Sequence, residues 1–224
     1  MLVGMRAIGS VGLALVTGAC INPVGVWDYD GIEGSGFLVT EARGVSGFDG
    51  ITVSGTGLVI VEQTGYESLH ITTDDNILRY IVTEVRGGML VMGARSNTSI
   101  ASSDGIVYHL TVRSLNEISI SGAVEVEALD IDTDGLIVTM SGATHVDVAG
   151  VVDWQDVQTS GASSYWGRDL FSRVATVQAS GSSVVVVNVR DRLTASASGV
   201  ALIEYVGRPQ VIANVSGGAT IRPY

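Results

Sequence analysis

The chain has 224 residues, of which 46% are hydrophobic and 6% aromatic, with 29 Gly, 3 Pro and a formal net charge of −11 at pH 7. This length suits one folded domain, and the acidic balance argues against nucleic acid as a partner. All 12 basic residues are Arg and the only cysteine is Cys20, which excludes lysine chemistry, an internal disulfide and a multi-cysteine metal site.

The segment 1–20 has the anatomy of an export signal. A positive charge at Arg6 precedes an uncharged apolar stretch, and small residues stand directly before Cys20. This ending resembles a lipobox, although Thr17 stands where an aliphatic residue is usual. We predict a lipoprotein-type signal peptide over 1–20 with lipidation of Cys20; the alternative is ordinary secretion with an incidental cysteine. Because Ile21 and not Asp follows, the outer membrane of a bacterial envelope is favoured, with the periplasm or secretion as the other destinations.

The next segments differ in their regularity. Residues 21–40 are rich in Gly and have no clean period, which predicts a tether or lead-in to a domain over 41–224. Residues 76–85 fit a short helical turn, a strand or irregular chain equally well. Several short apolar runs in residues 43–112 predict strands of an eroded version of the repeat described next: Ile51–Gly55, Leu58–Val61, Leu69–Thr72, Met89–Met92 and Ile106–Val112.

A Ser-Gly step recurs at nearly even intervals down the second half of the chain. The six steps are Ser121-Gly122, Ser141-Gly142, Ser160-Gly161, Ser180-Gly181, Ser198-Gly199 and Ser216-Gly217. Their period of about 19 residues is too short for a helix pair or a propeller blade. We predict an all-β fold, a parallel β-helix or solenoid with about 18–20 residues per coil, in which these pairs form a structural corner and the serines hydrogen-bond between coils.

Aligning the repeats on the serine gives columns that alternate in polarity. The position three before the serine is always apolar: Ile118, Val138, Val157, Val177, Ala195 and Ala213. The position two before it is always polar: Ser119, Thr139, Gln158, Gln178, Ser196 and Asn214. Alternation with period two places one column in the core and the other on the surface. The small residues after the glycines, such as Ala143 and Ala162, predict a corner that packs inward.

Several phrases resemble the putative auto-transporter adhesin, head GIN domain family. They are RGVSGFDGITVSGTGLVIVEQ at Arg43–Gln63, ITTDDNILRYIVTEVRGGMLVM at Ile71–Met92, YHLTV at Tyr108–Val112 and ALIEYVGRP at Ala201–Pro209. The resemblance spans about Arg43 to Tyr224, with the phrases in the family's order. It implies a β-helical domain on an exported protein, often a lipoprotein, with an adhesin or envelope role and no catalytic residues.

Asp130, Asp132 and Asp134 alternate before Gly135, like the start of a calcium loop. An EF-hand count from Asp130 requires Glu at a position that holds Ser141. We therefore expect an acidic strand edge ending in an Asp-Gly turn, with weak calcium binding as the alternative.

Other candidate sites are sparse. His70, His109 and His145 fall in different predicted coils, and His145 faces the same side as Asp147 without a nucleophile motif to complete a site. Aromatic residues gather around the third repeat, where we expect burial in a wide coil, with an exposed contact patch as the alternative: Trp154, Tyr165, Trp166 and Phe171.

Taken together, these patterns predict an exported, lipid-anchored envelope protein acting as a non-catalytic adhesin or ligand-binding module. The first alternative is a structural, self-associating envelope protein, and the second is a carbohydrate-active β-helix enzyme. The predicted partner is a surface glycan or protein, with the membrane reached only through the lipid anchor, no nucleic acid and no cofactor. Homo-oligomers are the further possibility that exposed edges of a solenoid create.

Overall fold

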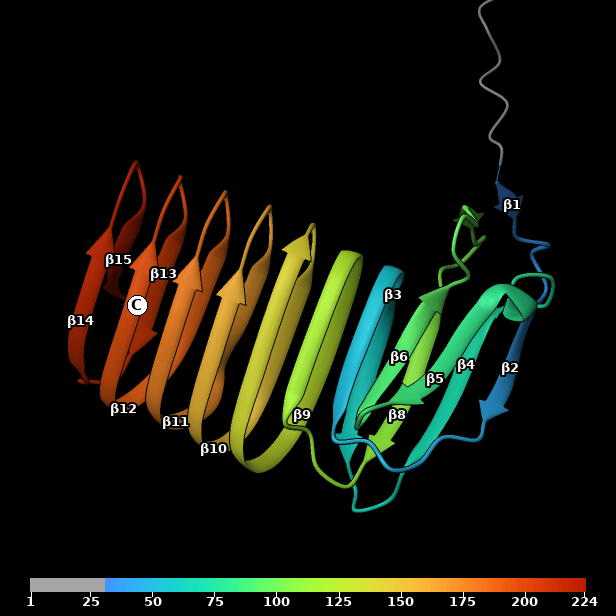
Figure 1. Ribbon diagram of the computed structural model, residues 1–224, viewed down its shortest axis with the longest axis horizontal. Helices are drawn as coiled ribbons and strands as arrows, with labels where there is room; N and C mark the ends of the chain where they lie inside the picture. The colour runs from blue at the N-terminus through green and yellow to red at the C-terminus, as the bar shows by residue number, and fades with distance from the viewer. Residues whose placement is uncertain (1–30) are drawn as a thin grey trace, which may run out of the picture. The chain divides into compact units, whose positions relative to one another are not determined.

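Residues 31–224 are built almost entirely from β-strands. A computed structural model describes these residues, and its strands form a two-stranded sheet and a 13-stranded sheet (Figure 1). The small sheet joins β1 (Ile32–Glu33) to β7 (Ile100–Ala101). The only helix in the described part is the 3₁₀ segment η1 (Leu78–Tyr80), so no helix found there has the length and apolarity to cross a membrane. The predicted all-β class is confirmed, and the large sheet is mixed.

The large sheet is most regular over residues 117–224, here called the stacked region. Its strands are β9 (Glu117–Gly142), β10 (His145–Thr159), β11 (Ser164–Ala179), β12 (Val184–Ala197), β13 (Leu202–Val206), β14 (Gln210–Val215) and β15 (Thr220–Pro223). All pairings among them are parallel. Thr159 lies beside Ala179, and Ala179 lies beside Ala197, each pair one repeat apart along the chain. The register therefore follows the columns obtained from the Ser-Gly alignment.

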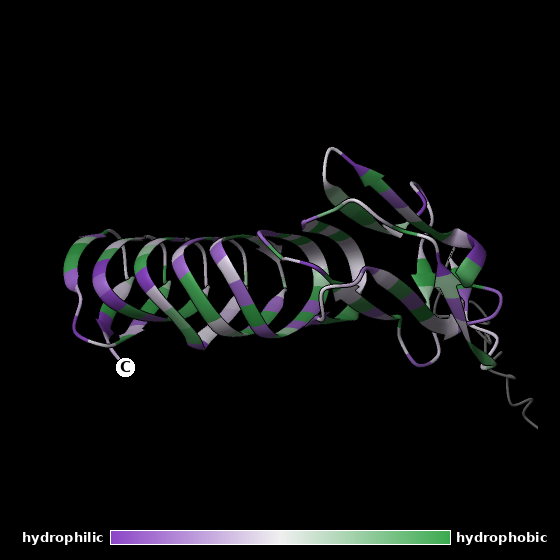
Figure 2. Ribbon diagram, turned by 90° about the horizontal axis from the view of Figure 1, so that it is seen from below, coloured by the Kyte–Doolittle hydropathy of each residue, from purple (hydrophilic) through white to green (hydrophobic). Residues whose placement is uncertain are grey.

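Alternation along these strands produces the core of the stacked region. The apolar column three positions before the serine is almost fully inaccessible through its first five members: Ile118, Val138, Val157, Val177 and Ala195. Figure 2 shows hydrophobic and hydrophilic residues alternating along the strands. Each Val or Ile that is fully buried in this way contributes about 1.5–3 kcal/mol. The polar column between the buried positions faces outward or is half-buried.

The Ser-Gly corners depend on glycine for two separate reasons. All six glycines have positive φ, between +71° at Gly217 and +98° at Gly122, where a Cβ is unfavourable. A Cβ on Gly142 would also lie 2.5 Å from the carbonyl oxygen of Gly122, because the corners stack directly. The expectation that the residue after each glycine packs inward is wrong: Ala143 and Ala162 are exposed. The following residue turns into the core instead, as Thr144 does, since the bend at glycine shifts the alternation by one position.

Residues 31–112, here called the N-terminal region, begin as a continuation of the stack. The long strand β3 (Gly50–Gln63) pairs in parallel with β9 over Gly50–Glu62. On its other edge it pairs in parallel with β6 (Met89–Ala94) and β8 (Val107–Val112). The other pairings of the large sheet in this region are antiparallel: β2 (Leu38–Arg43) with β4 (Ser68–Asp74), β4 with β8, and β5 (Ile81–Arg86) with β6. The short strands predicted in residues 43–112 are confirmed as parts of β3, β4, β6 and β8. The eroded repeat predicted there does not extend beyond β3 and its partners β6 and β8, because the other pairings are antiparallel.

A two-residue turn explains one of these reversals. Gly87 and Gly88 join β5 to β6, and both have positive φ, at 58° and 84°. Two consecutive residues with positive φ make the tight hairpin turn whose twist suits antiparallel strands. The ambiguous segment 76–85 resolves into η1 followed by β5, so it contains both a helical turn and a strand.

The first described residues form strands, where the sequence indicated a tether. Within the predicted lead-in over 21–40, residues 31–40 contain β1 and the first residues of β2, which pairs with β4. Residues 38–43 lack alternation because nearly all of β2 is exposed. The predicted signal peptide over 1–20, with Cys20, lies outside the described residues.

Candidate functional site

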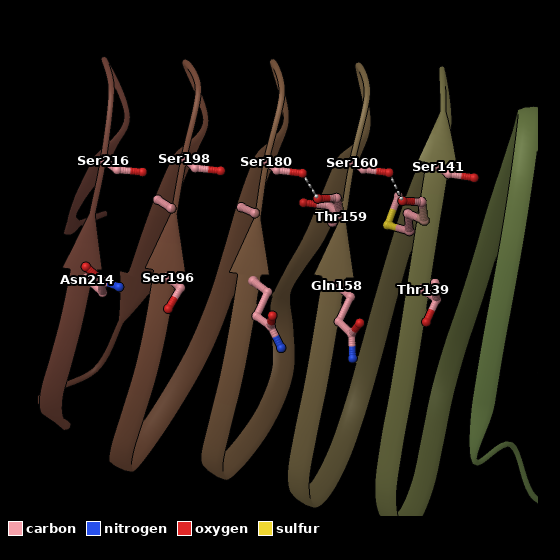
Figure 3. Close-up of a pocket in the computed structure, with 14 residues that line it drawn as sticks. Thr139, Ser141, Gln158, Thr159, Ser160, Ser180, Ser196, Ser198, Asn214 and Ser216 are labelled. Carbon is pink, nitrogen blue, oxygen red and sulfur yellow. Dashed lines mark hydrogen bonds between the residues drawn. The ribbon is translucent and has the colours of Figure 1, made fainter.

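An open trough of about 400 Å³ runs across the stacked region, along the ends of its strands before the glycine corners. Figure 3 shows that its polar side chains stand in two rows, one of serines and one of hydroxyl and amide groups. The serine row contains Ser141, Ser160, Ser180, Ser198 and Ser216. The second row contains Thr139, Gln158, Gln178, Ser196 and Asn214. Because neighbouring strands are about 4.8 Å apart, the five repeats present equivalent groups along about 19 Å.

Main-chain hydrogen bonds hold the serine row in register. The amide of Ser160 donates to the carbonyl oxygen of Met140 at 2.9 Å, and the amide of Ser180 donates to that of Thr159 at 3.0 Å. The hydroxyls of these two serines reach the same carbonyls at 3.4 and 3.3 Å, which are long for hydroxyl donors. Within residues 31–224 the row serines bond to main chain and not to one another. Their hydroxyls are therefore only weakly engaged and face the trough.

A layer of buried hydroxyls supports the trough from inside. The Thr144 hydroxyl donates to Ser163 Oγ at 3.1 Å, and the Thr159 hydroxyl donates to Ser183 Oγ at 3.0 Å. The Ser163 hydroxyl donates in turn to the carbonyl oxygen of Ser160 at 2.6 Å. These bonds satisfy polar groups that burial would otherwise penalise, and they fix the corner that carries the row.

No side chain that lines the trough is ionisable. General acid–base chemistry and nucleophile activation by a base need titratable groups within hydrogen-bond reach of a substrate. The trough offers only hydroxyl and amide groups and a few apolar contacts. Its chemistry therefore suits the recognition of a neutral polar ligand.

A second polar cluster lies inside the stacked region, out of reach of solvent. The Tyr165 hydroxyl donates to Gln155 Oε1 at 3.0 Å, and Gln155 Nε2 donates to Ser172 Oγ at 2.9 Å. Burial raises the pKa of Tyr165 far above its usual range. All three residues are nearly or fully inaccessible, so this cluster anchors the interior of the stacked region.

The three candidate calcium ligands do not converge. Asp130 has a positive φ of 59° and its side chain is exposed, as are those of Asp132 and Asp134. Main-chain atoms of Asp132 are held by the Gln63 side chain, with bonds of 2.8 and 3.1 Å. Strand β9 continues through Asp134 and Gly135, where a turn was expected. In the described part of the chain, no three His, Cys, Asp or Glu residues are placed to hold a metal ion.

The histidines are less scattered than the sequence indicated. His70 and His109 lie directly opposite each other on the antiparallel strands β4 and β8, and both are exposed. His145 lies on β10, and Asp147 follows two positions later. The pairing of His70 with His109 was missed because it depends on an antiparallel contact between segments that lie far apart in the sequence.

Three of the four clustered aromatic residues are exposed, contrary to the expected burial. Tyr165 is fully buried, whereas Trp154, Trp166 and Phe171 expose 43%, 37% and 58% of their surface. Only Tyr165 falls on an inward column of β11; Trp166 is its outward neighbour, and the Trp154 indole lies over Gly135. The period-two pattern therefore outweighs the general tendency of aromatic residues to be buried.

A buried carboxylate in the N-terminal region went unnoticed in the sequence. Asp74 accepts hydrogen bonds from the hydroxyls of Ser102 and Ser103, both at 2.6 Å, and from the amides of Ser103 at 3.0 Å and Gly36 at 2.8 Å. The two serine hydroxyls are the main reason that the pKa of Asp74 lies far below its usual range. Asp74 therefore ties the start of the described chain to the loop after β7. No local motif connects these residues.

The fold and the trough define an all-β protein built on one large mixed sheet, with an open polar surface along its parallel strands. Within this class, the chain belongs to the family described as "Putative auto-transporter adhesin, head GIN domain", whose sequence profile matches residues 47–209. The suspected family is thereby confirmed. The family's description as adhesins indicates an extracellular or envelope-associated protein.

Solved structures share this fold. A putative adhesin from Bacteroides fragilis superimposes with a TM-score of 0.70 at 21% identity, covering 87% of this chain and 100% of its own. A putative adhesin and a putative lipid binding protein, both from Parabacteroides distasonis, have TM-scores of 0.55 and 0.54 at 17% and 23% identity. They cover 87% and 86% of this chain, and 100% and 99% of their own. No curated protein matches the sequence.

Proposed function

We propose that the protein is a non-catalytic adhesin-type module that binds an extended neutral glycan along the trough. The observation that carries the proposal is the pair of in-register rows of hydroxyl and amide groups, without any ionisable side chain among them. Side-chain hydroxyls and amides both donate and accept hydrogen bonds, as sugar hydroxyls do. A surface that repeats every strand suits a ligand that also repeats.

Membership of a family described as adhesins supports the same function. The alternative of a carbohydrate-active enzyme receives no support from the trough, because glycoside hydrolysis uses paired carboxyl groups across the scissile bond. Asp156 accepts a long hydrogen bond of 3.5 Å from Gln158 Nε2 but does not itself line the trough, and no second carboxylate lines it either.

The proposal also covers the fold of the stacked region and the location of the protein in the cell envelope. The parallel register, in which Thr159 lies beside Ala179 and Ala179 beside Ala197, supports a parallel β-solenoid over the stacked region. The signal-like sequence over 1–20 supports export, and Cys20 supports a lipid anchor in the outer membrane. Labelling with a lipid precursor tests the anchor: Cys20→Ala should abolish incorporation, and persistence of the label would refute it.

The ligand is tested by retention of the purified protein on an array of bacterial and host surface glycans. Retention on one group of linear neutral glycans without cleavage is the expected result. The double variant Gln158→Ala with Gln178→Ala should lose most of that retention. Gln210→Ala removes an exposed amide outside the trough and should change nothing. Cleavage of the glycan, or equal retention of both variants, would refute the proposal; dependence on calcium would direct attention to Asp130, Asp132 and Asp134.

One observation favours self-association as a second candidate function. Strand β14 pairs with β12 and exposes Ile212 and Val215, by 55% and 46%. Exposed apolar edge strands are common sites of strand pairing between chains. Sedimentation at increasing concentration tests this: Ile212→Ser should reduce any oligomer, whereas Val200→Ser, at an exposed corner, should not. A monomer at all concentrations would refute it.

A further inference from the structure

A separate groove lies at the second bend of the repeats, away from the trough. It has a volume of about 550 Å³ and an apolar strip formed by Val151 and Phe171, which are paired neighbours on β10 and β11. These two side chains expose 57% and 58% of their surface. Val189 of β12 adds to the lining and is itself fully buried. An apolar strip of this kind is favourable for a ligand that removes it from water.

The polar groups on the floor of this groove are already engaged. The Ser172 hydroxyl donates to the carbonyl oxygen of Asn188 at 2.8 Å, and Asn188 Nδ2 donates to the carbonyl oxygen of Arg168 at 2.9 Å. The floor consequently offers a ligand apolar surface and few free hydrogen-bonding groups. This composition favours a hydrocarbon chain over a sugar ring.

The rim of the groove is positively charged. Arg190 binds Asp191 through two nitrogens, at 2.8 and 3.1 Å, and Arg173 lies between Asp191 and Asp153 at 3.5 and 3.4 Å. Arg208 also lines the groove and has no ion-pair or hydrogen-bond partner within residues 31–224. The rim therefore has three guanidinium groups but only two carboxylates, and the guanidinium without a carboxylate partner is that of Arg208.

Backbone geometry places Arg208 at this position. Gly207 has a φ of 104°, and a Cβ there would lie 2.2 Å from the carbonyl oxygen of Val189. Only glycine allows the chain to pass so close to β12. The surroundings are less acidic than the rest of the chain, since residues 151–224, which contain every groove residue, have six Arg and five carboxylate side chains, whereas the whole chain has a net charge of −11.

We propose that this groove binds a fatty acid, with the alkyl chain on Val151 and Phe171 and the carboxylate on Arg208. An unpaired guanidinium is the preferred protein partner of a carboxylate because it donates two parallel hydrogen bonds. The site is independent of the trough and of the glycan proposed there, so the two proposals stand or fall separately.

Calorimetric titration of the purified protein tests the proposal with three probes of equal chain length: dodecanoate, dodecanol and dodecyltrimethylammonium. Dodecanoate should bind with one-to-one stoichiometry and about tenfold more tightly than dodecanol, the equivalent of one charge-assisted hydrogen bond. The cationic probe should bind more weakly than either. Equal binding of the cationic probe, or an absence of dodecanoate binding, would overturn the proposal.

Two matched variants distinguish a direct contact between Arg208 and the ligand carboxylate from a general effect of positive charge. Arg208→Ala should lower dodecanoate affinity about three- to tenfold and leave dodecanol unchanged. Arg192→Ala removes an exposed charge on β12 that does not line the groove, and it should have little effect. An equal loss of dodecanoate affinity in both variants would mean that Arg208 acts only through its long-range charge, and it would refute the proposed contact between Arg208 and the carboxylate.

The apolar half of the site has its own pair of variants. Phe171→Ser should weaken dodecanoate and dodecanol alike by about three- to tenfold, since both lose the same apolar contact. Phe37→Ser changes another exposed phenylalanine, which lies in the N-terminal region and exposes 73% of its surface, and it should have no effect. Both side chains are largely exposed, so unchanged melting temperatures should verify the fold. Unaltered dodecanoate binding in a folded Phe171→Ser protein would contradict the proposed position of the chain. Binding to anionic phospholipid vesicles without binding of free dodecanoate would replace the proposed ligand by a membrane surface.

Discussion

The stacked region and the N-terminal region both cover the hydrophobic faces of strands, but they use different neighbours. In the stacked region each strand lies beside the next repeat of the same pattern, so glycine stacks on glycine and Val157 on Val177. In the N-terminal region, β3 is flanked by strands from three separate segments, and antiparallel pairs close the sheet. Pairing between like repeats gives aligned columns of residue types in the sequence. Pairing between unlike segments gives only the alternation within each single strand.

Glycine should show the largest difference between the two regions. Gly161 has a φ of 78° and its Cβ would lie 2.7 Å from the Gly142 carbonyl oxygen, whereas Gly65 has a φ of 83° and open space around it. Gly161→Ala should therefore reduce the free energy of unfolding by about 3 kcal/mol, and Gly65→Ala by about 1 kcal/mol. Urea denaturation measures both. Equal losses would mean that close stacking of the corners contributes nothing.

The buried amide of the stacked region should give the next largest effect. Gln155→Ala leaves the Tyr165 hydroxyl without its acceptor and Ser172 without its donor, and it opens a cavity. We expect a loss of about 3 kcal/mol in unfolding free energy. Gln158→Ala, an exposed change three positions later on β10, should cost less than about 0.5 kcal/mol. Similar values for the two variants in thermal or urea unfolding would contradict the importance of this cluster.

The sequence predicted most of the stacked region and little of the N-terminal region. The Ser-Gly spacing identified the register, since partners such as Thr159 and Ala179 recur at the repeat length. It did not reveal that Ala143 is exposed and Thr144 buried, because a bend at glycine changes the alternation. The Gly87-Gly88 pair was a readable hairpin signal that was overlooked.

The candidate sites were only partly predictable, for the same reason. The serines and polar residues of the trough are visible as columns in the sequence. The contacts of Asp74 with Ser102 and Ser103, and of His70 with His109, join segments without a common period. Such contacts need the three-dimensional arrangement of the irregular strands.

Acid should loosen the N-terminal region before the stacked region. The lowered pKa of Asp74 means that its ionised form stabilises the fold, and this contribution is present above the unfolded-state pKa near 4 and is lost as pH falls toward the folded-state value. Hydrogen exchange at the amides of Gly36 and Ser103 should accelerate below about pH 4 relative to Ser182, after correction for intrinsic rates. In Asp74→Asn these amides should exchange faster already at neutral pH, with a weaker dependence on acid. Uniform acceleration in both regions would contradict this role.

The smallest effect is expected for the serines of the trough. Ser180→Ala removes one long hydroxyl bond of 3.3 Å and should change stability by less than about 0.5 kcal/mol. Ser183→Ala, three residues later, removes a buried hydroxyl that donates to Ser180 and accepts from Thr159, and should cost about 1–2 kcal/mol. Equal, large losses in unfolding experiments would assign the serine row to stability and weaken its role as a ligand surface.

The most direct test of a repeating ligand surface is the affinity for linear oligomers, one to eight sugars long, of the glycan retained on the array. Five equivalent repeats along about 19 Å predict an affinity that rises with each added sugar and levels off once both rows of the trough are covered. The double variant Gln158→Ala with Gln178→Ala should flatten this rise. A monosaccharide that binds as tightly as the longest oligomer, or an unchanged length dependence in the variant, would contradict the account.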